Sequence, residues 1–381
     1  MDRPDWHILT GEYPPTPGGV SDYTRNLACA LAAGGERVHV WAPARGGLLE
    51  DPQVSTHPLR HGFMPAGLRE LSRVLDVQRR PRRLLLQYVP QAFGWKGMNL
   101  PFCAWLAARR KDELWVMFHE VAVGVSRRAP WRHNALGVVT QTMASLLAAR
   151  ADRLFVSVPQ WERFLRSFFP LARPATWLPI PSNVPTEVSA SAIARVRASL
   201  PIPAGATVIG HFGTYGLMAS SLAASLAQIL AGRGERFALL LGRGAKQFVE
   251  QKLSPLGVDL RRVVVPGELS GEKVAAHLAA CTLVIQPYPD GISSRRTSAM
   301  ASLALGVAIV TNDGQQTEDV WRASGGVAIA DEDTPEALAR LVDDLLHADA
   351  RRLDMATRGR DLYGRQFALA RTVATLRSFD R

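Results

Sequence analysis

The sequence predicts two α/β domains, each built on a doubly wound parallel sheet, and three observations lead to this fold class. Short apolar runs without polar alternation recur along the chain, and a segment with helical periodicity follows each of them. Such runs are typical of parallel strands that are buried on both faces. The 381 residues are enough for two ordinary domains. A proline-rich connector then divides the chain near its middle.

The predicted strands fall into two groups. Those of the first half are Trp6–Thr10, Arg37–Ala42, Leu84–Tyr88, Leu114–Phe118 and Leu154–Val158. Those of the second half are Thr207–Phe212, Ala238–Leu241, Val263–Val265, Leu283–Gln286, Val307–Thr311 and Val327–Ala330. Alternation of strands with helices favours βαβ units in both halves. Two such domains facing each other across a cleft would bind a ligand between the carboxyl ends of their sheets.

Several helices can also be predicted from periodicity. After Gly18-Gly19, one helical face collects Val20, Tyr23, Leu27, Ala30 and Leu31. Ser21 is the expected N-cap of this helix, and Gly34-Gly35 is its expected end. A second amphipathic helix is predicted from Glu272 to Ala280, and a last one from Asp361 to Ser378.

The domain boundary is expected at the connector Pro179–Pro185, because proline removes backbone donors and disfavours helix. We therefore divide the chain into a first domain at 1–183, a second domain at 184–360, and a C-terminal helix at 361–381 that packs back on the first domain.

The net charge of +11 is placed unevenly. Residues 1–183 hold 23 Lys and Arg against 14 Asp and Glu, a balance of +9, which leaves +2 for the remainder. A basic first half suggests an anionic partner there, such as a membrane surface or an acidic acceptor. Only five of the 45 basic residues are lysine, so a general bias toward arginine would explain the same count. No nucleic-acid-binding motif is present, so nucleic acid is not an expected partner.

Three separated cysteines, Cys29, Cys103 and Cys281, have no metal-ligand or disulfide spacing, which favours a reducing compartment. The N-terminus lacks the basic start and apolar run of a secretory signal, and no apolar stretch is long enough to span a bilayer. A cytoplasmic location is expected, with peripheral contact at the inner face of the membrane as an extension of it.

Candidate site residues of the first half follow two predicted strands. Gly18 and Gly19 open a helix, so its free amides and dipole would form an anion site, unless they make only a tight turn. His119 comes directly after the strand Leu114–Phe118. It could donate a hydrogen bond to a sugar hydroxyl, or it could be a structural histidine.

Basic and glycine-rich segments follow strands in the second half. Arg243 and Lys246 could clamp a diphosphate, since arginine supplies a fork of donors and lysine a point charge. A solvated basic loop is the alternative. Gly213 and Thr214 follow another strand, where glycine lets a ligand approach the backbone.

The most informative segment is Gln286–Met300, where a strand ends and a turn leads into a helix. Ser293 or Ser294 is the expected cap of that helix. The amides of residues 292–295 would then form an anion nest with two arginines beside it, and Asp290 would accept sugar hydroxyls. The expected members are Asp290, Gly291, Ile292, Ser293, Ser294, Arg295 and Arg296.

In two of its segments the sequence resembles the retaining GT-B glycosyltransferases of family four, which have two Rossmann-like domains. The first mark is the segment Tyr13–Thr24, and the second runs from Pro287 to Val310. The resemblance implies transfer of a sugar from a nucleotide diphosphate sugar to a glycan, lipid-linked or small-molecule acceptor with retained configuration. It implies no metal and no cofactor apart from the donor, and a role in polysaccharide biosynthesis.

The resemblance also assigns roles to individual residues. In that family two glutamates flank the nest, the first contacting the transferred sugar and the second holding the nucleotide ribose. Here Asp290 stands at the first position and Ser298 at the second. Arg243 and Lys246 match the diphosphate clamp, His119 a donor-sugar contact, and Gly18-Gly19 a phosphate or acceptor loop. The nucleobase would lie against Gly267, Glu268 and Leu269.

Catalysis in such a site would rest on charge stabilisation. Arg243, Lys246 and the nest amides would stabilise the leaving diphosphate, while His119 and Asp290 would position the sugar. Asp331 and Asp333 precede Thr334-Pro335 and are interpreted as part of a helix start rather than as a metal motif.

Two other functions stay open. An epimerase of the same fold would need an acid–base pair, for which Glu12, His119 and Glu120 are the candidates. A nucleotide-sugar-binding protein without turnover would fit the loss of the second glutamate at Ser298. A nucleic-acid binder is the remotest alternative.

Overall fold

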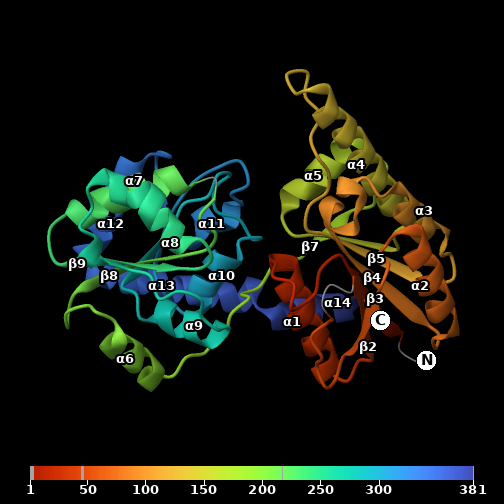
Figure 1. The fold of residues 1–381 in the computed structure, drawn as a ribbon, viewed down its shortest axis with the longest axis horizontal. Coiled ribbons are helices and arrows are strands. Elements are labelled where there is room, and N and C mark those ends of the chain that lie inside the picture. The colour runs from red at the N-terminus through yellow and green to blue at the C-terminus, as the bar shows by residue number, and fades with distance from the viewer. Residues whose placement is uncertain (1–3, 44–46, 217, 381) are drawn as a thin grey trace. The chain divides into compact units, whose positions relative to one another are not determined.

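The computed structural model describes residues 4–43, 47–216 and 218–380. The chain forms two compact units, of which the first comprises Met1–Pro179 together with Leu369–Arg381, and the second Ile180–Ala368. Each unit contains one sheet with helices on both of its faces (Figure 1). The predicted α/β class with two Rossmann-like domains is therefore confirmed.

In the described part of the first unit, the sheet has seven strands in the order β3-β2-β1-β4-β5-β6-β7. All neighbouring strands are parallel. The strands are β1 (Asp5–Thr10), β2 (Val38–Pro43), β3 (Ser55–Leu59), β4 (Arg82–Tyr88), β5 (Glu113–Phe118), β6 (Arg153–Val156) and β7 (Ala175–Trp177). The order reverses between β1 and β4, so the carboxyl ends of these two strands form the switch point.

The helices of the first unit surround this sheet. They are α1 (Gly19–Ala33), α2 (Pro65–Val77), α3 (Leu100–Ala108), α4 (Trp131–Arg150), α5 (Pro159–Phe168) and α14 (Leu369–Arg377). Short 3₁₀ segments lie at η1 (Pro90–Phe93), η2 (Trp95–Gly97) and η7 (Ser378–Asp380). Buried apolar side chains of β4 and β5 pack with those of α3 and α4 in one continuous core.

In the second unit, the described strands form a parallel sheet in the order β10-β9-β8-β11-β12-β13. They are β8 (Thr207–Phe212), β9 (Arg236–Leu241), β10 (Val263–Val264), β11 (Leu283–Gln286), β12 (Ile309–Asn312) and β13 (Ala328–Ala330). Here the order reverses between β8 and β11, which sets a second switch point at Gly213 and Pro287.

Helices also cover both faces of the second sheet. They are α6 (Ala190–Ser199), α7 (Ala219–Ala231), α8 (Ala245–Phe248), α9 (Gly271–Ala279), α10 (Thr297–Ala304), α11 (Asp319–Ser324), α12 (Pro335–Leu346) and α13 (Asp349–Leu362). The shorter turns are η3 (Val249–Leu253), η4 (Ser254–Leu256), η5 (Leu260–Arg262) and η6 (Tyr363–Phe367). Figure 1 shows α7 and α12 on one face and α9 and α10 on the other. A helix does start after Asp331 and Asp333, as predicted, and Thr334 caps this helix, α12, by accepting from the Ala337 N–H.

The two strands not predicted from the sequence are β3 and β7, the edges of the first sheet. β3 is partly exposed and contains Pro58, and β7 is only three residues long. Edge strands are partly solvated, short and tolerant of proline, so they lack the continuous apolar run that identifies a central strand.

Two predicted helix features are wrong in detail. Gly18 rather than Ser21 occupies the N-cap of α1, and the buried Ser21 hydroxyl donates to the Thr16 carbonyl at 2.6 Å. The segment Asp361–Ser378 is not one helix, because it divides at Ala368. Its first part belongs to the second unit, where the Phe367 ring stacks on Trp321 at 5.2 Å. Its second part, α14, belongs to the first unit.

Candidate active site

The carboxyl edge of the second sheet is held together by side chains of the two switch-point strands. The Gln286 amide donates to the Phe212 carbonyl at 3.0 Å. The imidazole Nδ1 of His211 lies 2.8 Å from the Ile285 carbonyl. Burial lowers the pKa of His211 to about 4, so the neutral ring donates through Nδ1–H. Gln286 and His211 were not predicted as site residues, although both are polar residues at the end of an apolar strand.

Glycines let the loops at this edge approach each other closely. A β-carbon at Gly242, whose φ is 110°, would clash with the Gly213 carbonyl oxygen. The Gly213 amide donates to the Leu241 carbonyl at 3.2 Å. Gly213 and the exposed Thr214 therefore lie directly beside the loop that carries Arg243.

The predicted clamp residues lie on this neighbouring loop. Arg243 follows β9 between Gly242 and Gly244, and Lys246 lies one turn later in α8. Both side chains are exposed, and neither makes an ion pair with any residue that the structure describes. Two unpaired cations beside the switch point are therefore available to an anionic ligand.

The segment Gly267–Leu269 follows β10 at the edge of the sheet. Gly267 has a φ of 87°, and both Gly267 and Glu268 are exposed while Leu269 is half-buried. The strand order places this segment next to the Arg243 loop, on the side away from β11. The contact of residues 267–269 with the nucleobase of a donor stays a prediction.

The loop after β11 is fastened to the neighbouring strand β12. The Tyr288 N–H donates to the Asn312 side-chain oxygen at 2.7 Å, and the Asn312 amide donates back to the Tyr288 carbonyl at 2.8 Å. Gly291 has a φ of 79°, and a β-carbon there would clash with the Gly314 amide. This close backbone packing requires glycine and gives the loop a fixed course.

Two of the four amides of the predicted anion nest, those of Ile292 and Ser294, already donate to groups of the protein itself. The Ile292 N–H donates to the Asn312 carbonyl at 3.3 Å. The Ser294 N–H donates to both oxygens of Glu318, at 3.1 and 3.2 Å. The Ser294 hydroxyl also donates to Glu318. The buried Ser293 hydroxyl makes no hydrogen bond with the described residues.

The expected serine cap is wrong for the same reason. The Glu318 carboxylate accepts hydrogen bonds from the N–H and the hydroxyl of Ser294. It also accepts from the Trp321 indole N–H at 2.7 Å. α10 begins only at Thr297, with Arg296 at its N-cap and no side-chain capping bond. Burial raises the pKa of Glu318, which the Ser294 and Trp321 hydrogen bonds oppose. Glu318 was missed because it comes from a different loop, 24 residues later in the chain than Ser294.

Asp290 lies in a positively charged environment. Its Oδ2 is 3.6 Å from Nη2 of Arg295 and 3.6 Å from Nη2 of Arg296. Arg295 is also held by the Gln316 side-chain oxygen at 2.9 Å, and the Arg296 guanidinium lies 4.8 Å from the centre of the Tyr288 ring. The half-exposed Asp290 carboxylate thus has a defined orientation beside two cations.

Ser298 forms a hydroxyl pair at the start of α10. Its Oγ lies 2.8 Å from the Tyr288 hydroxyl, which also accepts from the Ala299 backbone N–H. Burial raises the pKa of Tyr288 to about 12, so the phenol stays neutral. The Ser298 Oγ faces Gly213, 4.0 Å from the point where a β-carbon would stand. A neutral pair therefore occupies the position at which the resemblance predicts a carboxylate.

In the first unit, His119 is buried at the end of β5. Its Nε2 lies 2.7 Å from the Gln87 side-chain oxygen, and its ring packs edge-on against Tyr23 with centroids 5.0 Å apart. The His119 carbonyl accepts from the Trp161 indole at 2.8 Å. Burial lowers the pKa of His119 to about 3, so the ring is neutral and Nε2–H donates to Gln87.

The polar atoms around His119 are only partly paired. The Gln87 side-chain nitrogen and the Tyr23 hydroxyl are buried and make no hydrogen bond with the residues that the structure describes. Buried donors without partners are costly, so this group is suited to a hydroxyl-bearing ligand or to water. The three side chains come from β4, β5 and α1, which is why no local motif pointed to Gln87 or Tyr23.

The Gly18–Gly19 loop already holds an anion, the side chain of Glu12. The Ser21 N–H donates to Glu12 Oε1 at 3.1 Å, and the Val20 amide also stabilises the carboxylate. A β-carbon at Gly18 would clash with the same carboxylate. Burial raises the pKa of Glu12. The predicted phosphate contact at Gly18 and Gly19 therefore competes with a built-in carboxylate.

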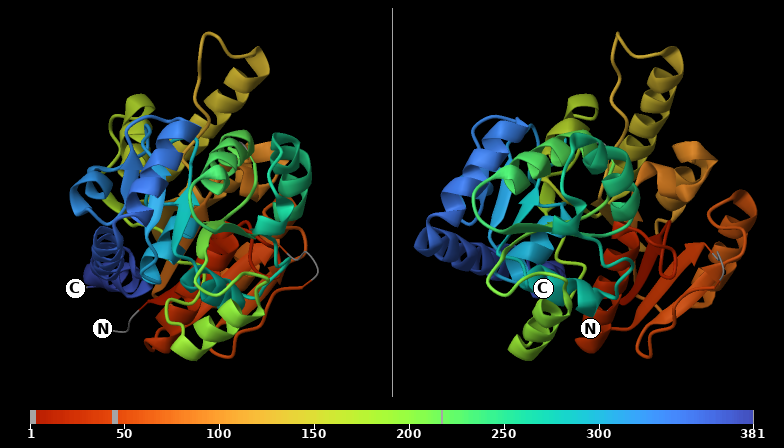
Figure 2. Two further views of the ribbon diagram at one scale, coloured as in Figure 1. Left: turned by 90° about the vertical axis from the view of Figure 1, so that its left-hand side faces the viewer. Right: turned by 60° about the vertical axis from the view of Figure 1, so that its left-hand side comes forward.

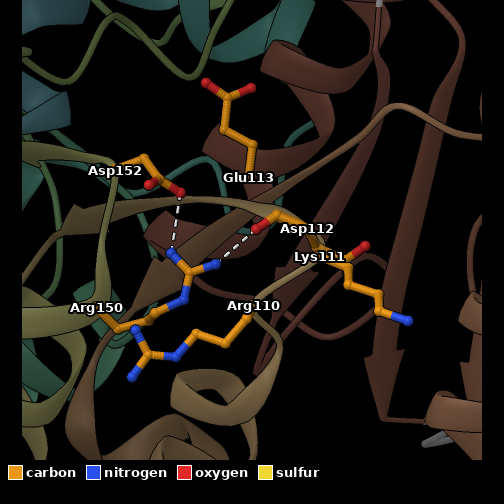
Figure 3. A pocket seen from close by; sticks show the side chains of 6 residues that line it. All are labelled: Arg110, Lys111, Asp112, Glu113, Arg150 and Asp152. Carbon is orange, nitrogen blue, oxygen red and sulfur yellow. Dashed lines mark hydrogen bonds and ion pairs between the residues drawn. The ribbon is translucent and has the colours of Figure 1, made fainter.

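A surface hollow in the first unit lies away from these residues (Figure 3). It is formed by residues at or just before the starts of β5 and β6, at the amino edge of the sheet. Arg150 pairs with Asp152 at 3.0 Å and donates to the Asp112 carbonyl at 2.6 Å. The lining residues are Arg110, Lys111, Asp112, Glu113, Arg150 and Asp152. Its acidic side chains are all in ion pairs, Asp152 with Arg150, Asp112 with Arg82 and Arg109, and Glu113 with Arg83, so it is a structural feature of that edge.

Asp331 and Asp333 lie before α12, and no group of three metal-ligand side chains is found in the described part of the chain. Nor does any helix within residues 4–43, 47–216 and 218–380 have the length and apolarity needed to cross a membrane.

Comparison with known families gives two matches that together account for most of the chain. Residues 18–182 match the model of a glycosyl transferase 4-like domain. Residues 208–348 match the model of glycosyl transferases group 1. No curated protein sequence shows significant similarity to the chain.

Comparison with solved structures shows the same fold over the full length. Sucrose-phosphate synthase from Thermosynechococcus elongatus has a TM-score of 0.75 at 16% identity, covering 100% of this chain and 98% of its own. HepE from Anabaena, solved in complex with UDP, has a TM-score of 0.71 at 15% identity, with 98% and 99% covered. WaaG, a glycosyltransferase involved in lipopolysaccharide biosynthesis, has a TM-score of 0.68 at 11% identity, with 98% of each chain covered.

Proposed function

This chain belongs to the GT-B glycosyltransferases, and we propose that it transfers a sugar from a nucleoside diphosphate sugar to a glycan or lipid-linked acceptor with retention of configuration. The observation that carries the proposal is the cationic carboxyl edge of the second unit. There the exposed Arg243 and Lys246 lie beside Gly213 without an ion pair to any described residue, and Arg295 and Arg296 flank Asp290. HepE has been solved with UDP-glucose, which supports a donor of this class.

In the proposed reaction, the bond between the anomeric carbon and the diphosphate oxygen breaks as the acceptor oxygen attacks. The departing diphosphate gains negative charge, which Arg243 and Lys246 stabilise. The acceptor proton passes to the oxygen of the departing phosphate on the same face of the sugar, so no protein base is required. Fixed cations perform the charge neutralisation that a metal ion would otherwise supply.

His119 and Asp290 have positioning roles in this proposal. With a pKa of about 3, His119 is neutral at physiological pH and does not act as a general acid. It can orient a sugar hydroxyl by hydrogen bonding. Asp290, oriented by Arg295 and Arg296, accepts from another hydroxyl. The Ser298–Tyr288 pair offers neutral hydroxyls to the ribose in place of a carboxylate.

A nucleotide-sugar-binding protein without turnover is the second candidate. The neutral Ser298–Tyr288 pair favours it, because a carboxylate that would hold the ribose is missing there. The epimerase alternative has no comparable support, since His119 is neutral and Glu12 is engaged by the start of α1.

Calorimetry with a panel of nucleoside diphosphates, followed by a donor-turnover assay, tests the proposal. Nucleoside diphosphate binding with release of that product from the matching nucleotide sugar is the expected result. Tight binding without turnover for any nucleotide sugar, with acceptors supplied, would favour the binding protein. No binding of any nucleoside diphosphate would remove both candidates.

A further inference from the structure

The exposed side of α4 carries a stripe of mostly apolar residues. Its buried face is made by residues such as Gly137, Met143 and Leu147. On the opposite side, Trp131 is 74% exposed and Val138, two turns later, is 57% exposed. Ala135, Thr142 and Leu146 continue this exposed stripe at helical spacing. A helix that is apolar on both sides is normally covered on both sides.

The start of α4 and the preceding loop project from the first unit. Figures 1 and 2 show this loop and helix extending beyond the other elements of the unit in every view. The loop follows β5 directly after His119 and Glu120, so the projection begins at the carboxyl edge of the sheet. It therefore starts beside the residues proposed to orient sugar hydroxyls.

The projection is an ordered structure rather than a loose loop. The Asn134 side chain accepts from the Ser126 N–H at 3.0 Å and donates to its carbonyl at 2.9 Å. His133 Nε2 lies 3.0 Å from the Gly124 carbonyl. The Val123 N–H donates to the Thr140 hydroxyl at 3.0 Å. These bonds fasten the backbone of the loop along the first turns of α4.

The charge of the projection has one sign. Residues 121–151 contain no Asp or Glu. Arg127, Arg128 and Arg132 are all exposed at the tip, next to Trp131 and to Val125, which is 51% exposed. Tryptophan and basic side chains together are typical of segments that lie at a membrane interface.

We propose that this projection, residues 121–138, is the element by which the protein docks on an anionic membrane surface. The arginines bind acidic lipid headgroups while Val125, Trp131 and Val138 enter the interface. Charge complementarity favours this occupant over a second copy, because the copy would bring the same basic surface. Docking there would present an acceptor held in the membrane to the carboxyl edge that carries His119, a point that rests on the proposed function.

Vesicle flotation of the full-length protein tests the proposal. The expected result is binding to vesicles of phosphatidylcholine mixed with phosphatidylglycerol, and much weaker binding to pure phosphatidylcholine. Replacing Arg127, Arg128 and Arg132 together by Gln should weaken binding about a hundredfold. Replacing Val125, Trp131 and Val138 together by Ser should weaken it about tenfold or more.

A matched control removes the same charge from the other edge of the sheet. Arg80, Arg110 and Lys111 are exposed and precede β4 and β5 at the amino edge. Changing all three to Gln should alter vesicle binding by less than about threefold. Circular dichroism and thermal unfolding of each variant confirm that it is folded.

A second readout reports where the chain meets the lipid. A cysteine placed at Val125, in a Cys29→Ser background, carries an environment-sensitive dye, and the same dye at Val77 serves as the control. Val77 is 82% exposed at the amino edge. The dye at position 125 should shift to the blue on vesicle addition, and the dye at position 77 should not.

Failure of vesicle binding by the wild type, or equal losses in the tip and control variants, would overturn the proposal. A dimer that the Val125, Trp131 and Val138 variant abolishes would instead assign α4 to a second copy. Vesicle binding needs no donor, so loss of the docking proposal leaves nucleoside diphosphate binding as a separate result. Conversely, vesicle binding without nucleotide binding would remove only the proposed function.

Discussion

The carboxyl edges of the two sheets share one topology but carry different charges. In the first unit, the start of α1 holds the Glu12 carboxylate, and the buried His119 is neutral. In the second unit, the exposed Arg243 and Lys246 have no ion-pair partner among the described residues. A helix N-terminus is an anion site only when the protein does not fill it with its own carboxylate. We infer that the diphosphate belongs to the second edge and neutral hydroxyls to the first.

The largest expected effect comes from removing the cations of the second edge. Changing Arg243 and Lys246 together to Ala should lower turnover by about 10²- to 10³-fold, because the charge on the leaving group loses its stabilisation. Binding of the nucleoside diphosphate should weaken by about ten- to a hundredfold. Steady-state kinetics and calorimetry measure the two effects.

Lys252→Ala provides the control for this variant, since Lys252 is an exposed lysine of η3 in the same unit. Turnover of the control should equal that of the wild type. Wild-type activity in a folded Arg243 and Lys246 double variant would contradict the assignment of the clamp.

The next effect concerns the anchor of the Gly291–Arg296 loop. Glu318→Ala removes the acceptor of the Ser294 N–H, the Ser294 hydroxyl and the Trp321 indole. Loss of three partly buried hydrogen bonds should lower the free energy of unfolding by about 3 kcal/mol. Urea unfolding monitored by fluorescence measures it. A change below about 0.5 kcal/mol would show that this loop does not depend on Glu318.

The third effect concerns His119 at the carboxyl edge of the first sheet, which makes the free energy of unfolding depend on pH. The pKa of His119 is about 3 when folded and near 6.5 when unfolded, so the unfolded chain binds the extra proton between these values. The free energy of unfolding of the wild type therefore falls as the pH drops below 6.5. This fall amounts to about 2 kcal/mol between pH 6.5 and pH 5. The His119→Gln variant should not show it, because glutamine does not titrate.

Urea unfolding of both proteins from pH 7 to pH 5 checks this prediction. The two stability curves should converge toward low pH. Curves that stay parallel over this range would mean that His119 titrates alike in the folded and unfolded chain.

The smallest expected effect lies at the Ser298–Tyr288 pair. Ser298→Ala removes one neutral hydroxyl, so nucleoside diphosphate binding should weaken by about fivefold, corresponding to about 1 kcal/mol. Calorimetry with the nucleoside diphosphate and with inorganic diphosphate distinguishes the cause. A ribose contact predicts a loss only for the nucleoside form, whereas equal losses for both ligands would place Ser298 at the phosphates.

Much of the fold could be predicted because central parallel strands are continuous apolar runs. Leu84–Tyr88 and Leu283–Gln286 are of this kind, and both lie within observed strands. β3 and β7 could not be predicted in this way, since an edge strand such as Ser55–Leu59 has polar residues and a proline. The break of the last helix at Ala368 depends on tertiary contacts that no local pattern encodes.

The site was less predictable than the fold, because its arrangement depends on contacts that no local pattern encodes. Local motifs identified the Arg243 loop and the segment after β11. They did not show that Glu12 fills the start of α1 or that Glu318 takes the Ser294 amide, because each carboxylate acts across a turn or from another loop. A serine near a predicted helix start predicts a cap only when no buried carboxylate competes for it.

Hydrogen-exchange mass spectrometry with and without UDP tests the central claim most directly. We expect slower exchange in the second unit, at residues 213–216, 242–248 and 291–298, and no change at residues 12–23 of the first unit. Protection confined to residues 12–23, with none at the three loops of the second unit, would contradict the assignment of the diphosphate to the cationic edge.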